Sequence, residues 1–225
     1  MNRRTLYIIG FISMIIDHIE YYFPNVPYYE VWRSIGRIAF PIFAFFLIEG
    51  FYHTKNLTAY KLRLLKGTVF LSIINLIQMI INGYLSFEQL FLPNIFFTML
   101  CGLFFIEGYE QLKVGKVKGF LSLMGSITLL LTICEYKEFA LFYFVIFTIL
   151  RNTKIKFLIS MIVFGCYCVY INDMIQFFMI FDNFLLCFYN GQLGKPFKQK
   201  YLFYYLYIGQ FIILSIMKYI LTVIS

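Results

Sequence analysis

The sequence predicts an all-α polytopic membrane protein, a helical bundle of about nine transmembrane helices, within a range of roughly eight to ten. Three observations predict this fold class. Hydrophobic residues make up 61% of the 225 positions and charged residues only 13%. The mean hydropathy is +0.80, which excludes an ordinary soluble domain. The apolar residues form runs near the length that crosses a bilayer, separated by short polar connections. We therefore expect one integral membrane domain over residues 1–225.

Nine apolar runs give the expected spans in chain order. They are 5–22, 35–52, 65–82, 92–107, 119–135, 138–151, 155–172, 174–190 and 202–224. The first run does not resemble a cleaved signal, because Asp17, His18 and Glu20 interrupt it and no small-residue cleavage site follows. We expect this run to remain in the protein as its first span.

Basic and acidic connections alternate between successive spans. Fifteen of the 19 Lys and Arg fall on the side that holds residue 1, leaving Arg33, Arg37, Lys137 and Lys218. The second connection is assigned Lys55, Lys61, Arg63 and Lys66, the fourth Lys113, Lys116 and Lys118, the sixth Arg151, Lys154 and Lys156, and the eighth Lys195, Lys198 and Lys200. The other connections carry mainly Glu30, Glu88, Glu135, Glu138 and Asp173. The positive-inside rule then places the N-terminus in the cytoplasm and the C-terminus outside. Because the net charge of +8 is spread over many connections, it does not indicate nucleic-acid binding.

The cysteines do not indicate a metal site or a disulfide framework. All five lie in apolar runs, without the spacing of a zinc site. They are Cys101, Cys134, Cys166, Cys168 and Cys187. We interpret them as small buried hydrophobic residues, and we expect no metal.

The first span carries ionisable residues at bilayer depth, where such groups are costly and usually have a function. His18 lies roughly 18 Å along the helix from the beginning of the run. Helical spacing turns His18 about 100° away from Asp17, so the two need not bond, while Arg37 of the second span is expected in the same outer layer. His18 is a candidate proton acceptor, because imidazole is the side-chain group whose ordinary pKa lies close to neutrality. The alternative is that Asp17 and Glu20 only neutralise Arg33 or Arg37 at the interface.

The second span carries a further polar layer at its inner end. Arg37 and Glu49 are twelve residues apart, or roughly 18 Å along a helix. Glu49 and His53 are i,i+4 neighbours, for which a helix-end ion pair is the alternative to a binding role. Pro41, one turn after Arg37, permits a kink that would open a cavity in the outer layer.

Polar residues of later spans are candidates to line the same cavity. They are Asn94, Thr98, Asp182 and Gln210. Interhelical hydrogen bonding is an equal alternative for all of them except Asp182. An unpaired carboxylate at mid-bilayer costs about 2.5 to 3.5 kcal/mol on an insertion scale. We therefore expect Asp182 to pair with Arg37 or His18.

The most distinctive motif is GRIAFPIFAFFLIEGFYHT at residues 36–54. Shorter motifs accompany it: DHI at 17–19, RLL at 63–65, NIFFT at 94–98 and YNG at 189–191. Together they resemble the TraX family, named for the conjugative F-pilin acetylation protein, over essentially the whole chain. The resemblance implies a multi-pass bacterial inner-membrane protein related to the transmembrane acyltransferases. These enzymes transfer acetyl groups from cytoplasmic acetyl-CoA to acceptors at the outer face.

The resemblance also implies roles for individual residues. A first-helix histidine is held to be essential in that group, and His18 is the matching position. The family's Tyr-Pro-Leu-His element appears as YIGQ at 207–210, which places Gln210 where a second histidine is expected. We expect His18 to act as proton acceptor or transient acyl carrier. Asp17 would orient or charge-stabilise it, and Arg37 would stabilise the oxyanion at the thioester carbon.

The expected donor is acetyl-CoA, a polyanion with a long thin arm. Its phosphates suit Lys55, Arg63 and Lys66, and Glu49 and His53 belong to the same inner set. The arm would then extend towards the outer layer. The acceptor is expected to be an amine or hydroxyl of a pilin, a glycan or a lipid-linked sugar, with membrane lipid as the surrounding partner.

Two other functional classes stay open from the residues alone. A transporter would use the same intramembrane charges as an ion or proton path. The sequence shows neither inverted repeats nor matched Gly/Pro-broken helices, which disfavours a transporter. A non-catalytic scaffold for pilus or surface-polymer assembly is the other alternative. CoA-dependent stability would distinguish an acyltransferase from both.

Overall fold

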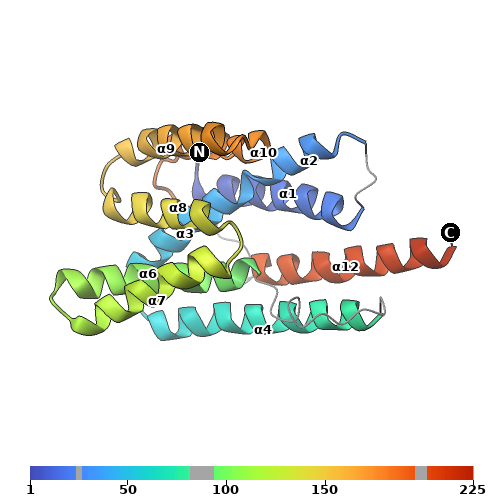
Figure 1. Cartoon of the computed structure of the whole chain (residues 1–225), viewed down its shortest axis with the longest axis horizontal. Helices are drawn as coiled ribbons and strands as arrows, with labels where there is room; N and C mark the ends of the chain where they lie inside the picture. The colour runs from blue at the N-terminus through green and yellow to red at the C-terminus, as the bar shows by residue number, and fades with distance from the viewer. Residues whose placement is uncertain (24–26, 82–93, 196–201, 225) are drawn as a thin grey trace. The chain divides into compact units, whose positions relative to one another are not determined.

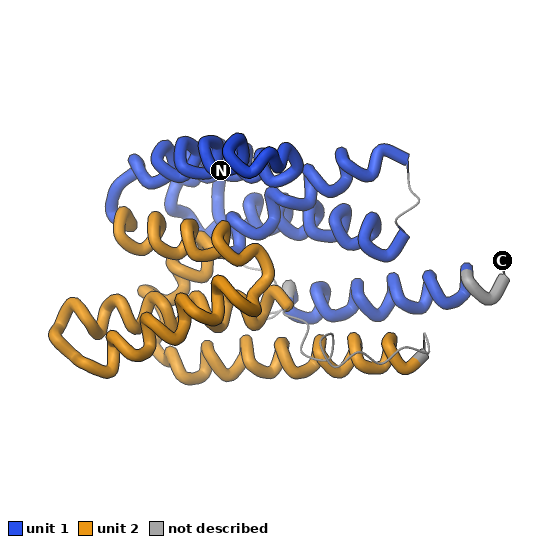
Figure 2. Tube along the Cα trace, viewed as in Figure 1, with its two compact units in different colours: residues 1–43, 152–225 blue, residues 44–151 orange. Residues whose placement is uncertain are grey.

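The computed structural model describes residues 1–23, 27–81, 94–195 and 202–224, which are helical apart from short connections (Figure 1). They cluster into two compact units (Figure 2). Unit 1 consists of Met1–Phe43 and Asn152–Ser225, and unit 2 of Ala44–Arg151. The expectation of a single domain over residues 1–225 stays a prediction, and each unit is described by itself.

Unit 1 is built on the first and last parts of the chain. Its helices are α1 Arg3–Tyr22, α2 Tyr29–Gly36, the first turn of α3 Ala39–His53, α9 Ile155–Ile171, α10 Met174–Phe177, α11 Ile180–Cys187 and α12 Leu202–Ile224. The helix α1 packs against α2 and α12, and α9 packs against α10 and α11. The contact between α1 and α12 therefore joins segments from the two ends of the described chain.

Unit 2 is centred on α6. Its helices are the remainder of α3, α4 Leu57–Ile81, α6 Ile95–Lys113, α7 Val117–Thr132 and α8 Lys137–Ile149. The helix α6 packs against α4, α7 and α8. Glycines permit these approaches: a Cβ at Gly102 would lie 2.2 Å from Cζ of the buried Phe144 on α8, and a Cβ at Gly108 would lie 2.7 Å from the backbone nitrogen of Leu123 on α7. Small residues of this kind let membrane helices approach closely.

The connections of unit 2 separate by charge. The α3–α4 and α6–α7 turns and the end of α8 lie at one end of the unit (Figure 1), and they carry Lys55, Lys116 and Arg151. The α7–α8 connection lies towards the opposite end and carries Glu135 (Figure 1). This is the alternation that the sequence predicted. The cytoplasmic placement of the basic end stays a prediction.

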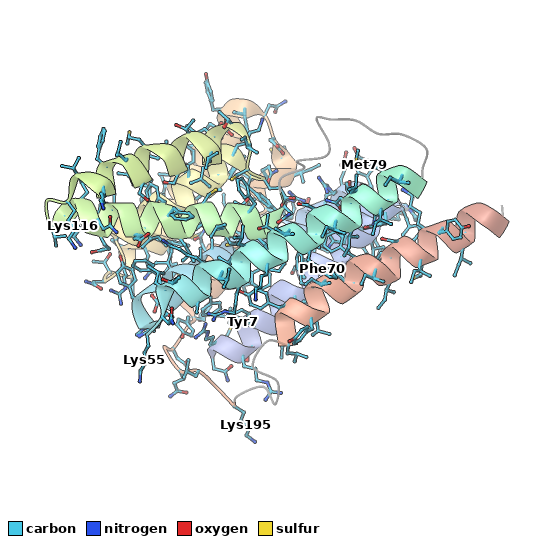
Figure 3. All side chains as sticks on the ribbon, turned by 90° about the horizontal axis from the view of Figure 1, so that it is seen from below. Tyr7, Lys55, Phe70, Met79, Lys116 and Lys195 are labelled. Atoms are coloured by element: carbon cyan, nitrogen blue, oxygen red, sulfur yellow. The ribbon has the colours of Figure 1, made fainter. Side chains whose placement is uncertain are left out.

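Exposed apolar side chains cover the outer faces of the long helices. On α4 they include Val69, Phe70, Ile73, Ile77 and Ile80. Lys55 lies just before that helix, Phe70 midway along it and Met79 near its far end (Figure 3). Such a continuous apolar face is typical of contact with lipid. Among the described residues, four apolar stretches are long enough to cross a membrane by length and composition: Tyr29–His53, which includes the α2–α3 break, Leu57–Ile80, Ile95–Lys113 and Tyr204–Leu221. They support a membrane protein, while the number of nine crossings stays a prediction.

Two predicted spans are broken in the structure. The run 174–190 is wrong as one helix, because α10 ends at Phe177 and α11 begins at Ile180. The run 35–52 is interrupted at Arg37–Ile38, and α2 occupies part of the predicted first connection. Pro41 explains the second break, since it has no N–H to donate to the carbonyl of Arg37. Hydropathy reports burial in lipid and does not report such breaks in helix continuity.

Several charged residues assigned to connections lie in helices instead. Lys61, Arg63 and Lys66 belong to α4, which begins eight residues earlier than predicted. Asn56 explains the earlier start, because its Oδ1 accepts from the Ala59 N–H at 2.8 Å and caps the polar first turn. Lys113, Lys118 and Lys156 are likewise helical, on α6, α7 and α9, because polar turns extend these helices beyond their apolar runs.

Two further expectations about individual residues need correction. Lys156 is buried on α9 instead of exposed in a connection. Cys166 and Cys187 are exposed, whereas the other cysteines are buried as expected. A thiol is compatible with a lipid-facing position as well as with a core. Glu88, Lys198 and Lys200 lie outside the described residues.

Candidate functional site

A buried ion pair in unit 1 joins α1 to the α2–α3 break. Arg37 Nη2 donates to Asp17 Oδ1 at 2.6 Å, and both residues are buried. Arg33 Nη1 lies 3.5 Å from the same carboxylate oxygen, and Arg33 Nε lies 3.4 Å from Glu20 Oε2. The predicted meeting of Asp17 and Arg37 is thus present in the structure. The ion pairs that the alternative interpretation expects for Asp17 and Glu20 are present as well, and the choice between the two roles stays a prediction.

Gly36 lets the two helices approach closely enough for this pair. A Cβ at Gly36 would lie 2.3 Å from Cβ of Asp17, closer than any side chain permits. The break after Gly36 then directs Arg37 towards α1. Glycine at 36 and Pro41 four residues after Arg37 therefore position this guanidinium together.

His18 contacts α12 instead of Asp17. Its Nδ1 lies 2.9 Å from Gln210 Nε2. The Phe211 ring lies with its centroid 4.5 Å from that of the imidazole, and the Tyr207 ring at 5.8 Å. Gln210 is buried, and its Oε1 has no hydrogen-bond partner among the described residues. Gln210, and not Asp17, therefore makes the hydrogen-bond contact with His18.

A second polar contact joins the same two helices. Ser215 Oγ donates to Tyr22 Oη at 3.2 Å, one helical turn beyond the His18–Gln210 contact on each helix. Lys218 Nζ lies 6.0 Å from the centroid of the Tyr22 ring. The sequence reasoning missed these residues, because a serine or a tyrosine near a helix end carries no specific signal.

Asp182 lies on α11 and is completely buried, as is its neighbour Asn183. Ser160 Oγ of α9 donates to Asn183 Oδ1 at 2.6 Å. The buried Lys156 lies one turn before Ser160 on the same helix. The pairing of Asp182 with Arg37 or His18 stays a prediction. The sequence reasoning missed this polar contact between α9 and α11.

The predicted inner set lies in unit 2. His53 Nε2 is 3.7 Å from Glu49 Oε2, so the expected i,i+4 contact is present. Lys55 and Lys66 are exposed, and Arg63 is half-buried with its Cζ 5.3 Å from the Tyr60 ring centroid. Their role in binding a donor stays a prediction.

Asn94 and Thr98 serve the helix framework of unit 2. Asn94 Oδ1 caps α6 by accepting from the Phe97 N–H at 3.1 Å, and its Nδ2 donates to the Thr68 carbonyl of α4 at 3.1 Å. Thr98 is fully buried, and its hydroxyl donates to the Asn94 carbonyl at 3.5 Å. The interhelical hydrogen-bonding alternative is therefore realised for Asn94, while a cavity-lining role for either residue stays a prediction.

A polar cluster at the basic end of unit 2 was not predicted. Tyr52 Oη donates to Glu110 Oε1 at 2.7 Å, and Arg151 Cζ lies 3.6 Å from the centroid of the Tyr52 ring. Lys61 pairs with Glu107 nearby on α6. Glu107 and Glu110 share one face of α6 by their i,i+3 spacing. The i,i+3 spacing of these two glutamates, next to connections rich in lysine and arginine, was the sequence signal that could have predicted the cluster.

The arrangement in unit 1 has the elements of proton-transfer chemistry. It holds an imidazole against an amide and two aromatic rings, within a predicted membrane segment. On the same helix, the neighbouring carboxylate binds a guanidinium. An imidazole is a proton acceptor near neutral pH, and a guanidinium can stabilise developing negative charge.

Comparison with known proteins identifies the relatives of this chain. No solved structure matches it. Among curated proteins, it is similar to the probable fimbrial assembly protein FimC, serogroup H1, of Dichelobacter nodosus, with 40% identity over 62 residues. That stretch is 27% of this chain and 25% of FimC, so the chain spans about a quarter of this relative's length. The family model described as TraX protein matches residues 2–218. This match covers nearly all of the sequence and confirms the predicted resemblance: the chain belongs to the TraX family.

Proposed function

We propose that this chain is an integral membrane acyltransferase of the bacterial inner membrane. In this proposal it transfers an acetyl group from cytoplasmic acetyl-CoA to an amine or hydroxyl of a pilin or another cell-surface acceptor. Membership of the TraX family supports a pilus-related membrane function. The single observation that carries the proposal is His18, held at 2.9 Å by Gln210 on an otherwise largely apolar helix pair. A titratable ring at membrane depth is a functional hypothesis by default.

The proposed reaction uses His18 as the proton acceptor. His18 takes the proton from the acceptor N–H or O–H as the acceptor atom attacks the thioester carbon. The C–S bond then breaks, CoA leaves as the thiol after receiving that proton, and the acetyl group remains on the acceptor. Arg37 stabilises the negative charge on the thioester oxygen, and Asp17 holds Arg37. Transient acetylation of His18 itself is the alternative route.

The donor's phosphates are proposed to bind the basic end of unit 2. Lys55, Arg63 and Lys66 supply cations there, and Glu49 and His53 complete the inner set. Phosphate groups bind guanidinium and ammonium groups through charge-assisted hydrogen bonds. The acceptor, whether pilin, glycan or lipid-linked sugar, is not specified by these residues.

A role in fimbrial assembly without catalysis is the second candidate function. The name of the D. nodosus relative favours it, over the quarter of that protein which the chain matches. This candidate expects no CoA binding and no defect from His18→Ala in a folded protein. A transporter, by comparison, should be stabilised by ions or by a soluble substrate.

Thermal stability with and without acetyl-CoA tests the proposal. Ligand at a hundredfold excess over its dissociation constant should stabilise the purified protein by about 2.7 kcal/mol. We expect this stabilisation in the wild type and in His18→Ala, and its loss in Arg63→Ala. Lys195→Ala, which removes an exposed lysine outside the proposed donor set, is the matched control. No stabilisation in any of these proteins would overturn the acetyl-CoA assignment.

A further inference from the structure

The contact between His18 and Gln210 bears on which imidazole nitrogen reacts, an inference that rests on the proposed function. The Gln210 amide faces the ring at Nδ1, with its Nε2 placed 2.9 Å from that nitrogen and its Oε1 without a hydrogen-bond partner among the described residues. No described residue forms a hydrogen bond with Nε2. The nitrogen left for an acceptor substrate is therefore Nε2.

A neutral imidazole carries its proton on one nitrogen and its lone pair on the other. For Nε2 to accept a proton, Nδ1 must already carry one. A proton on Nδ1 requires a hydrogen-bond acceptor opposite it. The amide of Gln210 offers an acceptor and a donor at its two ends, and a half-turn of the amide exchanges them at the ring.

Only one of the two amide orientations is compatible with proton transfer at Nε2. If the amide N–H donates to Nδ1, the proton of the neutral ring sits on Nε2 and no lone pair remains there. A ring protonated during the reaction carries N–H groups on both nitrogens, and an amide N–H would oppose the one on Nδ1. A half-turn of the amide from the placement above brings its oxygen to Nδ1, where it accepts from Nδ1–H both before and after Nε2 is protonated.

We infer that Gln210 is the positioning residue for His18, and that its amide oxygen accepts the Nδ1 proton and leaves the Nε2 lone pair for the acceptor substrate. The orientation of the partner group on one nitrogen sets the tautomer of a functional histidine. Gln210 is well placed for this role, because it is buried on α12 and the rings of Phe211 and Tyr207 flank the imidazole.

Asp17 does not provide this orientation in the structure. Its carboxylate binds Arg37 at 2.6 Å and lies 3.5 Å from Arg33, while helical spacing directs it away from the imidazole. A neutral amide also differs from a carboxylate in its effect on the ring, because it fixes the tautomer without adding a negative charge.

Nitrogen-15 NMR of the histidine rings tests the inference directly. The chain has only two histidines, His18 and His53. His53→Gln therefore leaves a single labelled ring in the detergent-solubilised protein. At a pH high enough for that ring to be neutral, its two nitrogen chemical shifts identify which atom carries the proton. We expect the proton on Nδ1.

Three further variants, each made with His53→Gln, distinguish orientation from general packing. Gln210→Glu keeps an acceptor opposite Nδ1 and should keep the proton there. Gln210→Leu removes both amide groups and should convert the signal to a mixture of the two tautomers. Ser215→Ala removes the neighbouring α1–α12 hydrogen bond and should leave the tautomer unchanged. A wild-type ring protonated on Nε2, or an unchanged tautomer in Gln210→Leu, would overturn the inference.

This readout is independent of acetyl transfer. If the tautomer is as inferred and acetyl-CoA fails to stabilise the protein, the proposed function fails and the positioning role of Gln210 stands. If acetyl-CoA binds and Nε2 carries the proton, the acyltransferase proposal stands and the positioning role fails.

Discussion

Each unit contains a carboxylate that pairs with a basic side chain, but the two pairs differ in their depth of burial. In unit 1, the side chains of Asp17 and Arg37 are 12% and 8% exposed. In unit 2, those of Glu107 and Lys61 are 25% and 19% exposed. The first pair lies beside a helix break and a close glycine contact. The second joins α4 to the C-terminal half of α6, near the polar end of that helix.

This difference determines what each pair contributes. Removing one partner of a deeply buried pair leaves a charge that solvent cannot reach. Removing one partner of a shallower pair lets water replace it at small cost. Breaking the unit 1 pair should therefore lower the free energy of unfolding by several kcal/mol, whereas breaking the unit 2 pair should lower it only modestly.

The largest expected effect is that of Arg37→Ala. The substitution should lower the free energy of unfolding by about 3 kcal/mol, near the lower end for a broken buried pair. The lower end applies because Arg33 remains 3.5 Å from the Asp17 carboxylate. Equilibrium unfolding of the purified protein in mixed detergent micelles measures this change.

The control for this prediction removes the stranded charge as well. Adding Asp17→Asn to Arg37→Ala should recover most of the lost stability, because a neutral amide tolerates burial better than a carboxylate. An Arg37→Ala variant as stable as the wild type would mean that burial does not distinguish the two pairs.

The sequence predicted the helical segments better than their continuity. Long apolar runs such as 202–224 coincide with helices because lipid exposure requires an unbroken apolar surface. The breaks at Arg37–Ile38 and after Phe177 were not located, since an apolar run has the same composition whether one helix or two carry it. Pro41 indicated a kink, but the break itself falls four residues earlier, at Arg37, because Pro41 has no N–H to donate to the carbonyl of that residue.

In the candidate site, the partners of charged residues were easier to predict than those of neutral residues, because an unpaired charge costs more free energy in an apolar environment. Asp17 and Arg37 were expected to meet because neither charge is stable alone in an apolar run. The meeting of His18 with Gln210 was not predicted, because neutral polar groups have many acceptable partners. These two residues are 192 positions apart, and the sequence does not fix which faces of distant helices meet.

An intermediate effect is expected for Lys61→Met. The substitution keeps the side-chain length and apolar stem but removes the ion pair with Glu107. It also removes the cation 4.1 Å from the Phe104 ring centroid. We expect a loss of about 1 kcal/mol, as for an ion pair that solvent partly reaches. Lys55→Met, at an exposed lysine, is the matched control and should not change the unfolding midpoint. A loss as large as that of Arg37→Ala would show that the unit 2 pair is buried more deeply than its exposure implies.

The smallest effect is expected for the contact between Glu49 and His53. The His53 side chain is 72% exposed, and its Nε2 lies 3.7 Å from the carboxylate of Glu49, whose side chain is 24% exposed, so solvent competes strongly for the imidazole. Exposed i,i+4 pairs contribute no more than about 0.5 kcal/mol, and His53→Gln should therefore leave the unfolding midpoint nearly unchanged. The same variant should reduce the stabilisation by acetyl-CoA if the inner set binds the donor. His53 can contact a ligand even if its ion pair with Glu49 contributes little to the stability of the free protein. A large stability loss without ligand would instead assign His53 a framework role, and an unaltered ligand response would remove it from the proposed donor site.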